Sequence, residues 1–191
     1  MRKIAKSLIN MKIKIVILCV MMVLFNFFIY KNSMAGEVKE YAVKAAFVFN
    51  FIKFIQWPEN KSLTQQNSSY KLCFIGNNVV ATQFTKLNGK TIGSKILETH
   101  RLLQARECQN CNIIFISKGT DALILKKIIS RVSGKPVLTI GETKKFTEIG
   151  GVISFFLKND HLHFAINIKA ANIQGLKMSS RLLKLAVIVD G

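Results

Sequence analysis

Three cysteines beyond the N-terminal segment are the residues best suited to do chemistry. They are Cys73, Cys108 and Cys111, and the last two form a C-x-x-C pair. A thioredoxin-type pair lies between a strand and the next helix, whose N-terminus lowers a thiol pKa. Here the pair precedes the apolar run 112–117, which is typical of a strand, so its position does not favour redox catalysis. A zinc site needs a second ligand pair at a recognisable spacing, which the sequence lacks.

Other candidate motifs are incomplete. His161 and His163 place two imidazoles on one strand face, but no third metal ligand is evident, and solvent-facing histidines are the favoured interpretation. Residues 88–91 resemble the end of a phosphate-binding loop, yet Phe84 stands where its first glycine is required. The histidines and carboxylates show no triad or paired-acid spacing. We therefore expect a non-catalytic protein without a cofactor or metal.

Residues 1–35 have the pattern of a secretory signal peptide. Basic residues are followed by an apolar run over 15–30, and then Ser33 and Ala35 stand at the −3 and −1 positions of a cleavage site. The alternative is a retained membrane anchor, but the run is shorter than the roughly 20 residues that span a bilayer. We expect cleavage and folding outside the cytoplasm. An odd cysteine count there indicates one disulfide and one spare thiol.

Residues 36–191 have the length of a single domain, and no linker or repeat divides them. Six of the 28 basic residues and none of the 10 acidic residues lie in the leader, residues 1–35. Residues 36–191 therefore carry a net charge of +12. The lysines are scattered and do not alternate with aromatic residues, which argues against nucleic-acid binding. Attraction to a membrane or an acidic partner stays open.

The elements that position these residues follow from apolar periodicity. A long helix is expected over 37–57, and a polar loop follows Pro58. Apolar strands alternate with helices after it, which predicts a parallel sheet covered on both faces. Residues 152–157 and 161–168 form a hairpin signal, and helices are expected over 170–176 and 179–189. The predicted fold is a three-layer α/β fold with a mixed sheet, parallel central strands, an antiparallel C-terminal hairpin and helices on both faces.

The hairpin can be resolved into two faces if Asn159 and Asp160 form its turn. One face pairs Leu157 with Leu162, Phe155 with Phe164 and Ile153 with Ile166, as expected of a core. The other face mixes apolar and polar residues: Lys158 and His161, Phe156 and His163, Ser154 and Ala165, Val152 and Asn167. Either the 179–189 helix covers this second face, or it is an open docking surface.

Several motifs in this order resemble the YfiR-like family of periplasmic proteins. The likeness covers nearly all of 41–187 and ends at Leu182-Leu183-Lys184-Leu185-Ala186. The motifs are Tyr41-Ala42-Val43-Lys44-Ala45-Ala46-Phe47, Trp57-Pro58, Leu72-Cys73-Phe74-Ile75-Gly76, Leu87-Asn88-Gly89-Lys90, Cys111-Asn112-Ile113-Ile114-Phe115-Ile116, Lys135-Pro136-Val137-Leu138-Thr139-Ile140, Gly150-Gly151, Ala170-Ala171 and Gly175-Leu176-Lys177-Met178-Ser179-Ser180.

The resemblance implies a periplasmic repressor. Such a protein binds the periplasmic domain of an inner-membrane diguanylate cyclase, so that cyclic-di-GMP and biofilm formation stay low. It also implies a homodimer, which the apolar excess of the 37–57 helix supports. A disulfide between Cys73 and Cys111 is implied, with Cys108 spare and a Cys108–Cys111 bridge as the competitor. The family's additional disulfide is absent, because no cysteine occurs over 112–191.

Two function classes remain. The first is the repressor, whose partner surface we expect on the second hairpin face and the start of the next helix, because a mixed patch on rigid strands suits a reversible interface. The second is a small-molecule sensor that uses the cleft at the carboxyl ends of the parallel strands. The predicted partner-binding residues are Val152, Phe156, His163, Ala165, Asn167, Lys169 and Ala171.

Overall fold

The computed structural model describes residues 18, 20–22, 36–58, 69–143, 145–159 and 161–190. Most of the predicted leader, the predicted loop after Pro58 and the turn residue Asp160 lie outside the described residues. The chain separates into two units, Met1–Glu40 and Tyr41–Gly191. In the first unit the described residues are helical. Among all described residues, none of the helices has the length and apolar character needed to cross a membrane.

The second unit is built on an eight-stranded sheet in the order β10-β8-β7-β6-β5-β2-β4-β3. The strands from β4 to β7 run parallel, β8 is antiparallel to β7, and β10 is parallel to β8. This confirms the predicted mixed α/β fold. The strands are β2 (Ser69–Ile75), β3 (Thr91–Ile92), β4 (Lys95–Arg101), β5 (Ile113–Ile116), β6 (Leu138–Gly141), β7 (Ile153–Lys158), β8 (His161–Asn167) and β10 (Val187–Val189).

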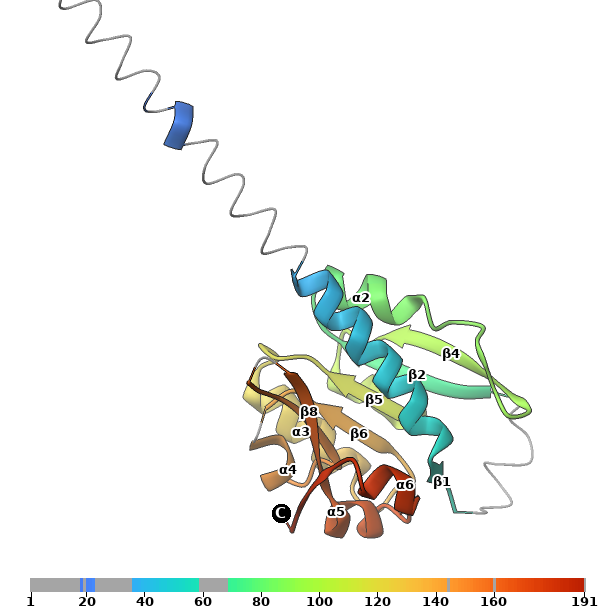
Figure 1. Ribbon diagram of the computed structural model, residues 1–191. Helices are drawn as coiled ribbons and strands as arrows, with labels where there is room; N and C mark the ends of the chain where they lie inside the picture. Colours follow the sequence, from blue (N-terminus) through green and yellow to red (C-terminus); the bar gives the residue numbers. More distant parts are fainter. Residues whose placement is uncertain are drawn as a thin grey trace, which may run out of the picture. The chain divides into compact units, whose positions relative to one another are not determined.

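Alternation along the central strands supplies the two faces of the core. Ile113 and Phe115 of β5 pack on one side, and Ile114 and Ile116 pack on the other. The helical residues 41–53 and α2 (Asn78–Thr85) cover the first side (Figure 1). The opposite side is covered by η1 (Ala105–Asn110), α3 (Ala122–Val132) and α4 (Lys145–Glu148).

Local signals set the helix ends. The side chain of Asn77 accepts a hydrogen bond from the Val80 amide, which caps the start of α2. The carboxylate of Asp121 accepts from the amides of Leu123 and Ile124, which caps α3. Two further short helices follow the hairpin, namely α5 (Ile168–Ile173) and α6 (Ser180–Leu183).

Two predicted helices were wrong in extent. The first helix ends at residue 53, and β1 (Ile55–Gln56) then pairs with β9 (Lys177–Met178). The predicted helix over 179–189 is instead α6 followed by β10, which lies parallel to β8. The β-branched residues Val187, Ile188 and Val189 favour a strand, and β8 offers them an edge to pair with.

The structure contains the disulfide between Cys73 and Cys111, with a Cα–Cα distance of 5.9 Å. Cys73 lies on β2, and Cys111 lies two residues before the neighbouring strand β5. Cys108 is a free and buried thiol, and burial raises its pKa. The C-x-x-C pair is therefore split between a disulfide and a shielded thiol.

Candidate protein-binding site

The hairpin of β7 and β8 has the predicted register. Phe155 pairs with Phe164, Phe156 with His163 and Ser154 with Ala165. Asn159 has a φ of 51°, a left-handed turn conformation that asparagine tolerates better than most residues. The core face is buried at Ile153, Ile166, Phe155 and Phe164, but its outer pair is not, since Leu157 is 60% exposed. The ring of Phe51 lies 4.8 Å from that of Phe164, centroid to centroid. The residues of the second face therefore project away from this aromatic core.

The inner half of the second face is covered by α4 and the turn before it. The side-chain amide of Asn167 donates to the Thr147 carbonyl at 2.9 Å, and the Ser154 hydroxyl donates to the Thr143 carbonyl at 2.6 Å. The side-chain Oδ1 of Asn167 also accepts from the Ala170 amide at 2.8 Å, which caps α5. The buried side chain of Asn167 thus links β8, where it lies, to α4 and to α5.

Val152 and Ala171, two other residues predicted for the partner surface, are also buried. The amide of Val152 donates to the Thr139 hydroxyl at 3.0 Å. Ala171 packs in the main core cluster. The part of the predicted surface that a partner can reach is therefore Phe156, His163 and Lys169, whereas Ala165 is buried and lines the hollow described below.

The outer half of the second face is open and contains a hollow of about 320 Å³. The rings of Phe156 and His163 stack beside it, with 5.7 Å between centroids and 21° between planes. The hollow joins α4, the hairpin and the C-terminal strand. Its lining residues are Thr147, Glu148, Ser154, Phe156, Ala165, Val187 and Val189.

β10 is the outermost strand on this side of the described sheet. Val187 is 51% exposed and Ile188 is 44% exposed, so apolar side chains continue from the hollow onto the sheet edge. An edge strand also presents backbone groups that a partner can pair with. Sequence reasoning missed Val187 and Val189 because a helix was expected there, although three successive β-branched residues are a strand signal.

A second polar cluster lies at the carboxyl ends of the parallel strands. β2 lies between β4 and β5, so the strand order reverses there, which is where open α/β sheets place ligands. Glu142, which follows β6, forms a buried ion pair with Lys44. Its carboxylate also accepts from the Tyr41 hydroxyl at 3.1 Å and from the Lys118 amide at 2.6 Å. These three protein donors bind the carboxylate at this edge.

The comparisons with known proteins agree with the resemblance seen in the sequence. The model of a family described as YfiR/HmsC-like matches residues 41–187. No curated protein matches the chain.

Two solved structures are similar at 14% identity. One is a conserved domain protein from Vibrio cholerae O1 biovar El Tor, with a TM-score of 0.43 over 67% of this chain and 56% of the other. The second is the ABC domain from Streptococcus pneumoniae in complex with L-Trp, with a TM-score of 0.45 over 68% of this chain and 57% of the other. Both likenesses are too distant to bear on function. The family match covers most of the chain, which therefore belongs to the YfiR/HmsC-like family of regulatory periplasmic proteins.

Proposed function

We propose that this protein is a non-catalytic regulator that binds the periplasmic domain of an inner-membrane diguanylate cyclase and represses it. Repression keeps cyclic-di-GMP low. Cleavage of a leader over residues 1–35 precedes this role. Membership of a regulatory periplasmic family supports the proposal. The structural observation that carries it is the open hollow between α4, the hairpin and β10, together with its exposed apolar edge.

This surface has the composition of a reversible protein interface. Phe156, Val187 and Val189 supply an apolar centre. His163, whose ring stacks on that of Phe156, and Lys169, two residues after β8, are exposed polar residues. Such interfaces combine an apolar centre with a polar rim and are built on backbone that moves little when the partner binds. The proposed partner-binding residues are therefore the accessible members of the predicted set, extended by Val187 and Val189.

A homodimer is part of the proposal. Val43, near the start of the helical segment 41–53, and Phe54, which directly follows it, keep large apolar side chains exposed. Exposed apolar residues on one helix favour a symmetric contact between copies. Light scattering of the purified protein at micromolar concentration is expected to return the mass of a dimer, and a monomer mass contradicts this part of the proposal.

Phe156→Glu tests the docking surface, with Leu157→Glu as its matched control. Leu157 is the next residue of the same strand, is 60% exposed and points to the opposite side. Both variants introduce one carboxylate at an accessible position of β7. We expect both to fold, and only Phe156→Glu to stop capturing the cyclase from solubilised membranes.

Cellular cyclic-di-GMP gives the functional readout. It should rise in cells that carry Phe156→Glu, towards the level of a strain lacking the protein, and stay low with Leu157→Glu. If the pull-down recovers no membrane cyclase with the wild-type protein, the proposed function is wrong. If the wild type captures it and Phe156→Glu does so equally well, the function stands and the surface is wrong.

A further inference from the structure

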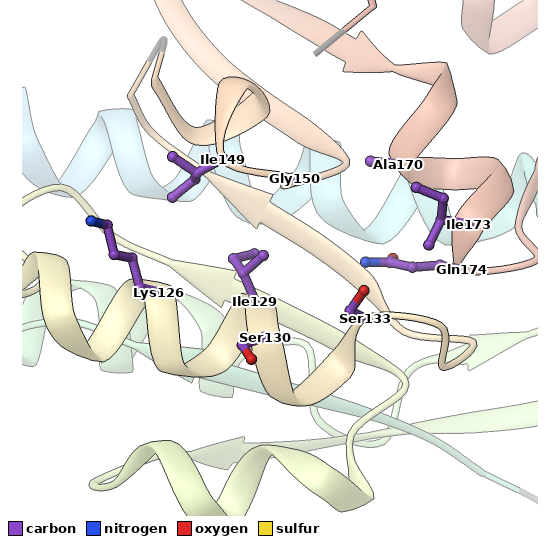
Figure 2. A pocket seen from close by; sticks show the side chains of 9 residues that line it. All are labelled: Lys126, Ile129, Ser130, Ser133, Ile149, Gly150, Ala170, Ile173 and Gln174. Carbon is purple, nitrogen blue, oxygen red and sulfur yellow. The ribbon is translucent and has the colours of Figure 1, made fainter.

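A second depression lies between α3 and α5 and shares no lining residue with the hollow beside the hairpin. Its volume is about 360 Å³, within the roughly 300–1,000 Å³ typical of small-molecule sites. Three isoleucines, Ile129, Ile149 and Ile173, form its apolar walls (Figure 2). Lys126 lies at the end beside Ile149, and Gln174 lies at the opposite end beside Ile173.

Gln174 is the unusual member of this groove. Only 4% of the residue is exposed, and within the described part of the chain its Oε1 atom has no hydrogen-bond partner. Buried polar atoms are almost always paired, so an unpaired amide oxygen at a groove calls for a donor from outside. Figure 2 shows the carboxamide directed toward α3, across the groove. The last side-chain torsion of glutamine is two-fold, so either the oxygen or the nitrogen can face a ligand.

The chemistry of the two ends defines the ligand. A carboxamide is the complement of a peptide group, because it accepts from an N–H and donates to a C=O. The isoleucines suit an apolar side chain. At the opposite end the Lys126 ammonium suits a carboxylate. We propose that the groove binds a short peptide whose backbone amide pairs with Gln174, whose apolar side chain packs on the isoleucines and whose free C-terminal carboxylate lies beside Lys126.

The dimensions agree with a tripeptide. Two lining residues of the groove mark its length along α3. Lys126 is the first lining residue on this helix, and Ser133, which directly follows the helix, is the last. A helix rises 1.5 Å per residue, so these positions are roughly 10 Å apart along its axis. An extended chain spans about 3.3–3.6 Å per residue, and three residues therefore bridge the distance.

Isothermal titration calorimetry of the purified protein with Ala-Ala-Leu tests the proposal. The same peptide with an amidated C-terminus is titrated for comparison, because its carboxylate is replaced by a neutral carboxamide and the rest of the peptide is unchanged. Gln174→Met keeps the side-chain length but removes the carboxamide, and it should weaken binding of both peptides about tenfold. Lys126→Gln should weaken only the free acid, by up to about fivefold. Lys127→Gln is the matched control, because Lys127 is exposed on α3 and does not line the groove.

The variant Ile173→Glu tests peptide binding in the groove independently of Gln174. Ile173 is 56% exposed, so a charge there is compatible with folding, and a carboxylate in the groove should abolish binding of the free acid. This variant decides the matter if Gln174→Met does not fold. The proposal is overturned if Ala-Ala-Leu does not bind at millimolar concentration, or if Gln174→Met and Ile173→Glu both bind it normally. Equal affinity for the free and the amidated peptide overturns the assignment of Lys126.

Discussion

The buried ion pair between Lys44 and Glu142 allows the sharpest test of how this fold is held together. The pair joins the helical segment 41–53 to the end of β6, across 98 sequence positions. Removing one partner of a buried pair leaves an uncompensated charge and costs about 3–5 kcal/mol. Lys44→Met leaves the Glu142 carboxylate with hydrogen bonds from the Tyr41 hydroxyl and the Lys118 amide, but without the Lys44 ammonium. We expect this variant to lose about 3 kcal/mol of unfolding free energy.

Glu142→Gln is the complementary change. Its amide oxygen can still accept from Tyr41 and Lys118, but the buried Lys44 ammonium loses the charge of Glu142, and we again expect a loss of about 3 kcal/mol. The double variant removes both charges and keeps the acceptor, so it should lie within about 1 kcal/mol of the wild type. The wild type, the two single variants and the double variant form a double-mutant cycle. Its coupling energy between Lys44 and Glu142 should reach or exceed the upper end of the roughly 0.5–3 kcal/mol measured for residues in contact.

Urea unfolding of the oxidised protein measures the four free energies, and thermal melts provide a check. For a chain of this size a loss of 3 kcal/mol lowers Tm by about 6–12 °C. The matched control is Lys53→Met, which removes an exposed lysine of the same helix and should change stability by less than about 0.5 kcal/mol. Additive losses in the double variant, or single losses below about 1 kcal/mol, refute the reasoning.

Three further predictions concern the disulfide, the spare thiol and the cap of α5. Replacing Cys73 and Cys111 by serine should lower the unfolding free energy by on the order of 4 kcal/mol, seen in urea titrations, because their bond closes a long loop. Cys108 should resist iodoacetamide at pH 8 until the protein unfolds, since burial raises its pKa and keeps it a thiol; mass spectrometry checks this, and fast native labelling contradicts it. Asn167→Ala should cost about 2–3 kcal/mol, because it removes the cap of α5 and leaves the Thr147 carbonyl one donor short; a loss below 1 kcal/mol in urea titrations contradicts it.

Local patterns were enough to predict the sheet and the hairpin. The continuous apolar run 113–116 indicated a strand buried on both faces, and Asn159 marked a turn that set the register of β7 and β8. The residues alone left two disulfide pairings open, and the family resemblance favoured the one that the structure contains. In these cases the deciding interactions lie within one element or one turn, so the sequence pattern carries them directly.

Other features depend on contacts between distant segments and were missed. The pairing of Lys44 with Glu142 leaves no local signal, since each is an ordinary charged residue in its own stretch. For the second hairpin face we weighed only a cover by the 179–189 helix against an open docking surface, whereas α4 covers its inner half through Thr147. The strand at 187–189 was read as helix because the preceding residues suited one, and its pairing with β8 decides otherwise. Which surface is open thus depends on tertiary packing.

The segment over 141–151 connects the three places on which the proposals depend. It begins beside Glu142 of the buried ion pair, continues through Thr147 of the hollow and ends next to the groove residues Ile149 and Gly150. Phe146 in its middle is fully buried and packs against Gly141 and Gly151, at both of which an added Cβ would collide with its ring. Because those glycines leave no spare space, a shift of α4 requires Phe146 to move. A partner at the hollow would contact Thr147 and Glu148, and a peptide in the groove would contact the next two residues, Ile149 and Gly150, so both ligands would touch one tightly packed element.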